Sequence, residues 1–371
     1  MRIATGILIA LAITVAGCVT SELPPPPPPP PIDEPATSGG EEPEHAVVRV
    51  LFATDRNRTG TLQPASMFGG KRADLTYGTC DVSIPREHRM GVLESPSLWR
   101  LEFREDPQKH VVLLGVETLG REQFAARLDE RLRSAKKRSA FVFVHGYNVS
   151  FEDAARRTAQ ISYDLGFPGV PMFYSWPSQA STALYVEDEQ NVEWAETNLH
   201  SFLGDVLTKS GHAEIVLVAH SMGNRALTRV IAALSRESPA LRSRIKEIIL
   251  TAPDIDADVF RRALAPALIA TGRPITLYAS SNDLALVASK QAHGYGRAGE
   301  SGPGLIVIPG IETIDATDVD TSLLGHSYYG DSRSVLADMF HLLREGKRAG
   351  QRTGLKAIDG ANGRRHWTIA P

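Results

Sequence analysis

Apolar residues in the middle of the chain come in short unbroken runs, each followed by a stretch with helical spacing. The clearest run is Ile215–Val218, and Asn224–Ser235 after it carries apolar residues three and four positions apart. An unbroken run is typical of a strand covered on both faces, and the later spacing is typical of a helix with one buried face. Ser221 lies between the two, so the chain must turn sharply at this serine.

Small residues flank this turn, because Ala219 and Gly223 each lie two positions from Ser221. Such neighbours tolerate positive φ and close packing, and the stretch fits a nucleophile elbow of the G-x-S-x-G type with Ala in the first glycine position. The serine hydroxyl would lie at a helix N-terminus, where backbone N–H groups stabilise developing negative charge. A plain helix cap is the alternative role for Ser221.

Strands and helices alternate from residue 139 onward, which indicates an α/β fold with a parallel sheet and helices on both faces. The predicted strands are Ala140–Val144, Val170–Tyr174, Ile215–Val218, Glu247–Leu250, Ile275–Tyr278 and Leu305–Ile308. The predicted helices are Phe151–Leu165, Glu189–Lys209, Asn224–Ser235 and Asp256–Leu264. Before residue 139, strands are predicted at Val48–Thr54, Tyr77–Ile84, Trp99–Phe103 and Val111–Val116, and a helix at Gln123–Lys137. We expect these strands to form an antiparallel start of the sheet that contains no titratable cluster.

The N-terminus has the composition of a targeting segment. Arg2 precedes an apolar stretch, Ile3–Val15, that is short for a membrane span, and the sequence VAGC (15–18) follows. This end resembles the lipobox of bacterial lipoprotein signal peptides. The resemblance implies a signal peptide over 1–18, lipidation of Cys18 and a domain tethered in the bacterial cell envelope, with the outer membrane favoured over the inner. A plain secretory signal or an uncleaved anchor is the alternative.

Three further segments follow the signal peptide. Residues 19–45 are interpreted as a disordered linker because they contain the eight-proline run Pro24–Pro31. Residues 46–345 are interpreted as the globular domain. Residues 346–371 are basic and Gly-rich, and we expect a solvated tail there, with contact to anionic lipid as the alternative.

Composition narrows the function classes. The chain of 371 residues contains 42% hydrophobic and 22% charged residues, which is ordinary for a globular protein. Its formal net charge of -3 gives no reason to expect a nucleic-acid partner. If Cys18 is lipidated, Cys80 is the only other cysteine, and we expect it to be a buried small apolar residue. Because H-E-x-x-H, C-x-x-C and a phosphate loop are missing from the sequence, no metal and no cofactor are predicted.

Seven stretches between about residues 46 and 345 together resemble the α/β-hydrolase fold, and in particular a bacterial α/β-hydrolase family catalogued as being of unknown function. They are ATDR (53–56), YGTCDVSIP (77–85), FVFVHGYNVSFEDA (141–154), YSWPS (174–178), AHSMGNRAL (219–227), LYASSNDLAL (277–286) and GHSYY (325–329). The resemblance implies a mostly parallel central sheet of about eight strands and a serine hydrolase of the esterase or lipase type.

A serine hydroxyl needs a positioned base, and on this fold the acid and then the histidine follow the serine along the chain. His326, in the loop after the last predicted strand, is the predicted base. His293 precedes that strand, His341 lies inside an amphipathic helix, and His366 lies in the tail.

Two aspartates compete for the role of the acid. Asp283 follows the strand Ile275–Tyr278 and is the predicted residue, whereas Asp254 follows the preceding strand and is the alternative. Asp256 is interpreted as a helix cap.

The oxyanion requires two N–H donors. One is predicted to be the backbone of Met222, and the other the backbone of Tyr147, with Asn148 as runner-up. The second donor lies in a loop that begins with His145 and Gly146, which resembles the HG oxyanion motif.

Several nearby residues complete the predicted site. Trp176, Pro177 and Tyr185 are possible pocket walls, and Ser178–Asp188 is the longest candidate lid. His220 is interpreted as structural.

The sequence therefore predicts cleavage of a carboxylic ester, either a small molecule or a lipid, with the membrane reached only through the lipid anchor. A thioesterase, amidase or phospholipase would use the same triad, and a non-catalytic envelope-anchored binding protein on this fold is the alternative of another class. Neither acyl chain length nor oligomeric state can be inferred from these residues.

Overall fold

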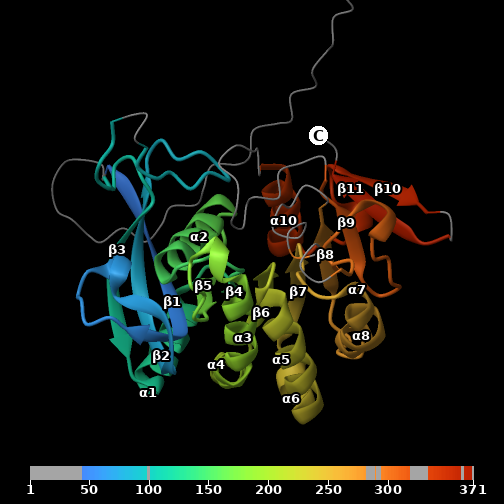
Figure 1. The fold of residues 1–371 in the computed structure, drawn as a ribbon, viewed down its shortest axis with the longest axis horizontal. Helices are drawn as coiled ribbons and strands as arrows, with labels where there is room; N and C mark the ends of the chain where they lie inside the picture. Colours follow the sequence, from blue (N-terminus) through green and yellow to red (C-terminus); the bar gives the residue numbers. More distant parts are fainter. Residues whose placement is uncertain are drawn as a thin grey trace, which may run out of the picture.

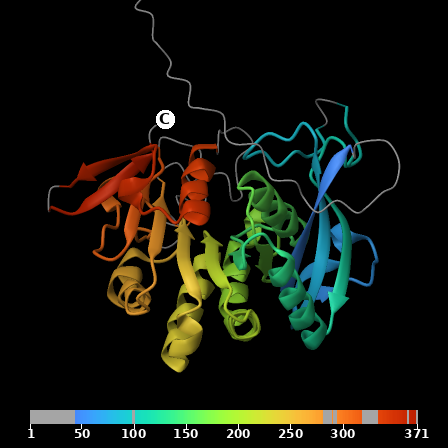
Figure 2. The ribbon, with the colours of Figure 1, turned by 180° about the vertical axis from the view of Figure 1, so that it is seen from behind.

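The computed structural model describes residues 44–97, 101–280, 289, 294–317, 333–360 and 363–369. One mixed sheet carries helices on both faces, with the blue N-terminal strands at one end and the red C-terminal strands at the other (Figures 1 and 2). The strand order is β10-β11-β9-β8-β7-β6-β4-β5-β1-β2-β3. The α/β-hydrolase fold class is confirmed, and the sheet has 11 strands where about eight were expected.

The elements have the following bounds. The strands are β1 His45–Arg58, β2 Phe68–Pro85, β3 Val112–Leu119, β4 Ser139–Val144, β5 Val170–Ser175, β6 Glu214–His220, β7 Ile245–Thr251, β8 Ile275–Ala279, β9 Glu312–Asp315, β10 Leu355–Asp359 and β11 Arg365–Ile369. The α-helices are α1 Arg121–Ser134, α2 Phe151–Asp164, α3 Tyr185–Trp194, α4 Glu196–Lys209, α5 Gly223–Glu237, α6 Pro239–Arg242, α7 Ala257–Val259, α8 Ala265–Ile269 and α10 Arg333–Glu345.

The central strands run parallel and end at one edge of the sheet. The pairs β1–β5, β5–β4, β4–β6, β6–β7, β7–β8, β8–β9 and β9–β11 are parallel, whereas β1–β2, β2–β3 and β10–β11 are antiparallel. The carboxyl ends of β1, β4, β5, β6 and β7 therefore open toward the same side. On open α/β sheets this is where ligands bind.

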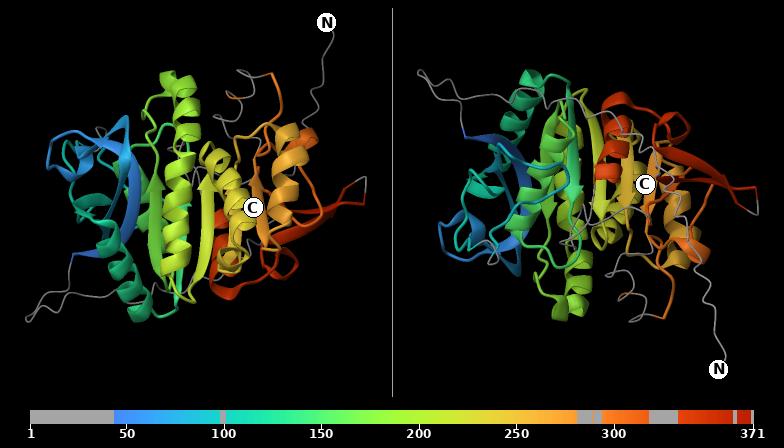
Figure 3. Two further views of the ribbon diagram at one scale, coloured as in Figure 1. Left: turned by 90° about the horizontal axis from the view of Figure 1, so that it is seen from below. Right: turned by 90° about the horizontal axis from the view of Figure 1, so that it is seen from above.

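Unbroken apolar strands arise because the sheet has a core on each face. On β1, Leu51 and Ala53 belong to one apolar cluster, whereas Val50 and Phe52 belong to the other. Helices α1, α3, α4 and α5 cover the first cluster, and α2 and α10 cover the second (Figure 3). Cys80, on β2, is buried in the second cluster as expected.

Two predicted strands are wrong in the described residues. Residues 101–103 of the predicted strand Trp99–Phe103 form no strand, since Leu101 has φ of 56° and the side chains of Leu101 and Phe103 are 76% and 75% exposed. The apolar run Leu305–Ile308 is not a strand either. It packs irregularly against the first core, and β9 follows it.

The predicted helices are present with changed bounds. The single helix expected at Glu189–Lys209 is two helices, α3 and α4, which meet at Ala195, whose carbonyl accepts a hydrogen bond from Tyr174 Oη at 3.2 Å. The helix after Asp256 continues beyond Leu264 through a π-helical turn, and Asp256 caps it as expected.

The N-terminal predictions, including the lipidation of Cys18 and the linker, lie outside the described residues. Among the helices that the structure does describe, none combines the length and the apolar character that a membrane span needs.

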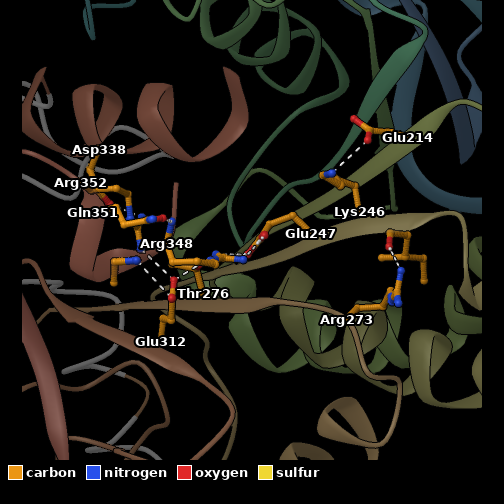
Figure 4. Close-up of polar contacts among 12 residues, drawn as sticks. Glu214, Lys246, Glu247, Arg273, Thr276, Glu312, Asp338, Arg348, Gln351 and Arg352 are labelled. Carbon is orange, nitrogen blue, oxygen red and sulfur yellow. Dashed lines mark hydrogen bonds and ion pairs between the residues drawn. The ribbon is translucent and has the colours of Figure 1, made fainter. Parts of the chain in front are cut away.

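The C-terminal segment is not the solvated tail that its composition suggested. Strands β10 and β11 extend the sheet beyond β9, and two arginines bind carboxylates on the sheet and on α10 (Figure 4). Arg348 pairs with Glu247 at 2.9 Å and with Glu312 at 3.0 Å. Arg352 pairs with Asp338 at 2.7 Å and with Glu312 at 3.1 Å. The basic residues of this segment therefore include buried structural ion pairs.

Breaking the Arg352–Asp338 pair should destabilise the whole domain. The side chains of Arg352 and Asp338 are 0% and 3% exposed, so Arg352→Met leaves a buried carboxylate unpaired, which typically costs about 3–5 kcal/mol. Urea unfolding should show this loss. Arg365→Met, which breaks an exposed pair with Asp359, is the matched control and should change the free energy of unfolding by less than about 1 kcal/mol. Equal effects of the two substitutions would show that the C-terminal segment is not part of the cooperative unit.

Candidate active site

The turn at Ser221 has the strained backbone that its small neighbours predicted. Ser221 joins β6 to α5 with φ of 47°, a value that a non-glycine residue adopts only when its surroundings hold it. The Asn224 side chain provides this restraint by donating to the Ser221 carbonyl at 3.0 Å and to the Thr251 carbonyl at 3.1 Å. The Ser221 N–H also donates to the Thr251 carbonyl, at 3.0 Å. The end of β7 thus fixes the turn.

Two glycines bring the loop after β4 against Ser221. A Cβ atom on Gly146 would lie 2.9 Å from Ser221 Cβ and 2.7 Å from His220 Nδ1. A Cβ atom on Gly223 would lie 2.3 Å from the His145 carbonyl oxygen. Any side chain at either position would push the loop away from the serine. The sequence predicted a need for small residues at Ala219 and Gly223, and the structure supplies the steric reason for Gly223.

The candidate oxyanion donors lie on both sides of this contact. In the described part of the chain, the Met222 N–H at the start of α5 has no acceptor. The Asn148 N–H is directed to Asp188 Oδ2 at 3.4 Å, so the runner-up donor already has an acceptor. Tyr147 stays the predicted second donor.

The predicted base and acid are not placed. His326 and Asp283 lie outside the described residues, as does His293, so the triad stays a prediction. His341 lies on α10 and bonds to Glu345 at 2.7 Å, and His366 lies on β11.

Comparison with known proteins identifies the family. A family model described as "Alpha/beta hydrolase of unknown function (DUF900)" matches residues 121–345. The chain belongs to this alpha/beta hydrolase family.

Solved structures add only distant likenesses. A lipase/esterase from Lactobacillus plantarum has 12% identity and a TM-score of 0.29, and the alignment covers 68% of this chain and 87% of that one. A CIB-like hydrolase from Thermoplasma acidophilum has 15% identity and a TM-score of 0.30, with 57% and 88% covered. No curated protein matches the chain.

In this hydrolase, the carboxylate of Asp254 is held by three hydrogen bonds and two arginine ion pairs. Asp254 Oδ1 accepts a hydrogen bond from Ser289 Oγ at 2.6 Å and lies 3.3 Å from Arg297 Nε. Asp254 Oδ2 accepts from Tyr185 Oη at 2.5 Å and from Arg225 Nη2 at 3.0 Å. A carboxylate has about four acceptor positions; three are taken by these hydrogen bonds, and Arg297 faces Oδ1 as an ion pair without a hydrogen bond. This occupancy argues against Asp254 as the acid that orients a catalytic histidine.

The same ion pairs fix α3 beside the nucleophile turn. Arg225, on the first turn of α5, also binds Glu189 of α3 at 2.6 Å and the Asp254 carbonyl at 2.6 Å. Tyr185 begins α3, so its hydroxyl joins this group from the same helix. Rather than lining a pocket freely, Tyr185 anchors α3 to the loop after β7.

The candidate lid Ser178–Asp188 is tied at both ends. Asp188 accepts from Ser178 Oγ at 2.6 Å and from the Gln179 N–H at 2.7 Å. Trp176 is fully buried, stacks on the His145 ring with centroids 5.0 Å apart and donates to the His145 carbonyl. Trp176 therefore supports the oxyanion loop, and Pro177 beside it is buried as well.

Sequence reasoning missed two charged residues at the end of β1. No titratable cluster was expected in the N-terminal strands, yet the side chains of Asp55 and Arg56 are buried. Asp55 Oδ2 accepts from Tyr174 Oη at 2.6 Å and from Asn198 Nδ2 at 3.1 Å, and Oδ1 has no partner among the described residues. The available signal was a pair of opposite charges directly after an apolar strand. As for metals, the described residues contain no cluster of three or more His, Cys, Asp or Glu ligands.

The two aspartates can be separated by their effect on Ser221 reactivity. Asp283→Asn should slow labelling by a fluorophosphonate about 10⁴-fold, the typical loss when a triad acid is replaced. Asp254→Asn should slow it by no more than about 10-fold, because it weakens a structural anchor and leaves the histidine oriented. The rate of probe incorporation, followed by mass spectrometry, gives both numbers. The reverse order would make Asp254 the acid.

Burial of Asp55 should make stability depend on pH. Desolvation raises the pKa of Asp55 to about 6, against the hydrogen bonds from Tyr174 and Asn198, which lower it. The folded state therefore gains stability as pH falls through about 6 toward the unfolded value near 3.8. Relative to Asp55→Asn, the wild type should gain about 2 kcal/mol in free energy of unfolding between about pH 7.5 and about pH 4.5. Parallel pH profiles for the two proteins would refute the buried ionised carboxylate.

Proposed function

We propose that this family member is a serine hydrolase that cleaves carboxylic esters through an acyl-enzyme formed on Ser221. The observation that carries the proposal is the positive φ of Ser221, which is held at the β6–α5 turn with Gly146 packed against it. A protein gains no stability from such strain, and strained residues of this kind cluster at functional sites. The family membership and the position at the carboxyl edge of the sheet agree with this chemistry.

The proposed reaction has two halves. Ser221 Oγ attacks the ester carbonyl while His326 takes its proton, and collapse of the tetrahedral intermediate expels the alcohol, which receives that proton from His326. His326 then removes a proton from water, which attacks the acyl-serine. Collapse of this second intermediate releases the carboxylic acid, and His326 returns the proton to Ser221 Oγ. Asp283 holds the imidazole in the required tautomer.

The negative charge of each tetrahedral intermediate would fall between α5 and the loop after β4. The Met222 N–H, at the start of α5, would donate a hydrogen bond to the oxyanion, and the dipole of α5 would also stabilise its charge. The Tyr147 N–H would supply the second bond. Removing one such donor typically lowers kcat about 10²–10³-fold.

Replacing the serine should abolish both covalent labelling and turnover. Wild-type protein should be labelled by a fluorophosphonate and should hydrolyse at least one member of a series of p-nitrophenyl esters of increasing acyl length. Ser221→Ala should not be labelled and should lose about 10⁶-fold in kcat. Ser201→Ala, an exposed serine on α4, is the matched control and should behave as wild type. Labelling of Ser221→Ala equal to wild type would exclude Ser221 as the nucleophile.

A further inference from the structure

Arg56 is a buried cation with an unusual set of partners. Its side chain is fully buried, and all five polar contacts of its guanidinium are with neutral groups. Burial lowers the pKa of Arg56 to about 10, so the group is still charged at neutral pH. No carboxylate lies in direct ion-pair contact with it, although the charges of Asp55, Asp188 and Asp153 raise its pKa from farther away. Burying a charge without a direct ion-pair partner costs several kcal/mol. Arg56 therefore invites a functional explanation.

The guanidinium connects the segments that surround the oxyanion loop. Nη2 donates to the Val149 carbonyl at 2.6 Å, and Nη1 donates to the Ser178 carbonyl at 2.8 Å. Nε donates to Ser175 Oγ at 2.8 Å, and Nη2 lies 3.4 Å from His145 Nε2. One side chain from β1 thus reaches both ends of the loop 145–149 and the end of β5.

These contacts select one tautomer of His145. Arg56 can only donate hydrogen bonds, so Nε2 beside its Nη2 must accept, and Ser175 Oγ, which accepts from Arg56 Nε, can donate its own hydrogen to Nε2 at 3.1 Å. Two donors facing Nε2 require it to be an acceptor, so the proton lies on Nδ1. Burial and then the charge of Arg56 hold the pKa of His145 well below its usual range, so the ring stays neutral.

The Nδ1–H of His145 then fixes the peptide that carries the predicted donor. His145 Nδ1 lies 2.8 Å from the Gly146 carbonyl oxygen, to which it donates. In a trans peptide the carbonyl and the following N–H point in opposite directions. Holding the Gly146 carbonyl toward the His145 ring therefore sets the direction of the Tyr147 N–H. The positive charge of Arg56 behind the ring also polarises this chain of hydrogen bonds.

We infer that Arg56, acting through Ser175 and His145, is a positioning residue that orients the Tyr147 N–H for the oxyanion. The inference rests on the proposed function, because it assigns a role in that reaction. Arg56 does not touch the substrate. Its effect should appear in kcat, where the oxyanion is stabilised, and much less in KM.

Substitutions at His145 test the donor directly. Asn places a side-chain N–H where His145 has Nδ1–H, so His145→Asn should keep the bond to the Gly146 carbonyl and stay within about 10-fold of wild-type kcat. His145→Leu loses the donor and should lower kcat about 10²-fold with KM within about 3-fold. If His145→Asn and His145→Leu lose activity equally, the ring acts only by packing and the inference is wrong.

Substitutions at the start of this series of hydrogen bonds test Arg56. Arg56→Met should lower kcat at least about 10-fold, and Arg49→Met, which removes a half-exposed arginine from the same strand, should leave kcat unchanged. If Arg56→Met does not fold, Ser175→Ala removes one donor to Nε2 and should lower kcat in the same direction. If Arg56→Met folds and keeps the wild-type kcat, the inference is wrong. If only Ser175→Ala folds, a wild-type kcat in that variant overturns the inference.

Imidazole ¹⁵N NMR separates the failure of the inference from the failure of the proposed function. In wild-type protein at about pH 7, the His145 signal, assigned by its loss in His145→Asn, should show a neutral ring protonated at Nδ1. A ring protonated at Nε2 would refute the positioning chain whatever the activity. If the wild type reacts with neither esters nor a fluorophosphonate, the proposed function fails, and the tautomer still reports on the chain of hydrogen bonds.

Discussion

The structure depends on one strained residue that its neighbours hold in place. Ser221 keeps a positive φ because the Asn224 amide binds the carbonyls of Ser221 and Thr251, and because only glycines fit at 146 and 223. Strain of this kind costs about 1–3 kcal/mol and persists only where the surroundings determine the backbone from several sides. Here β4, β6 and β7 each contribute a restraint. The turn is therefore a property of the whole central sheet.

Buried charges around this turn link segments that are distant in sequence. Asp254 accepts hydrogen bonds from Tyr185, Arg225 and Ser289, and Arg56 donates hydrogen bonds to the loops after β4 and β5. Both groups lie at the carboxyl edge of the sheet, where loops would otherwise move independently. Satisfied polar networks of this sort rigidify and specify a site more than they stabilise the fold. Their concentration at one edge is what the proposed chemistry requires.

Local sequence patterns predicted the central strands and helices, whereas features that depend on pairings between distant residues were missed. The strand, turn and helix around Ser221 follow from adjacent residues, as do the cap at Asp256 and the buried Cys80. The strands at 355–359 and 365–369 were missed because they join the sheet only through β9, which is distant in sequence. The basic composition also hid the ion pairs with carboxylates on β7, β9 and α10. Arg56 was missed because nothing adjacent to it shows that it is buried. His326 and Asp283 were predicted from chain order and stay predictions.

The most direct test of Ser221 as the nucleophile is a crystal structure of the fluorophosphonate adduct. We expect a bond between phosphorus and Ser221 Oγ, with the phosphoryl oxygen about 2.7–3.1 Å from the backbone nitrogens of Met222 and Tyr147. Phosphorus bound to another residue, or an oxygen that approaches neither nitrogen, would contradict this expectation.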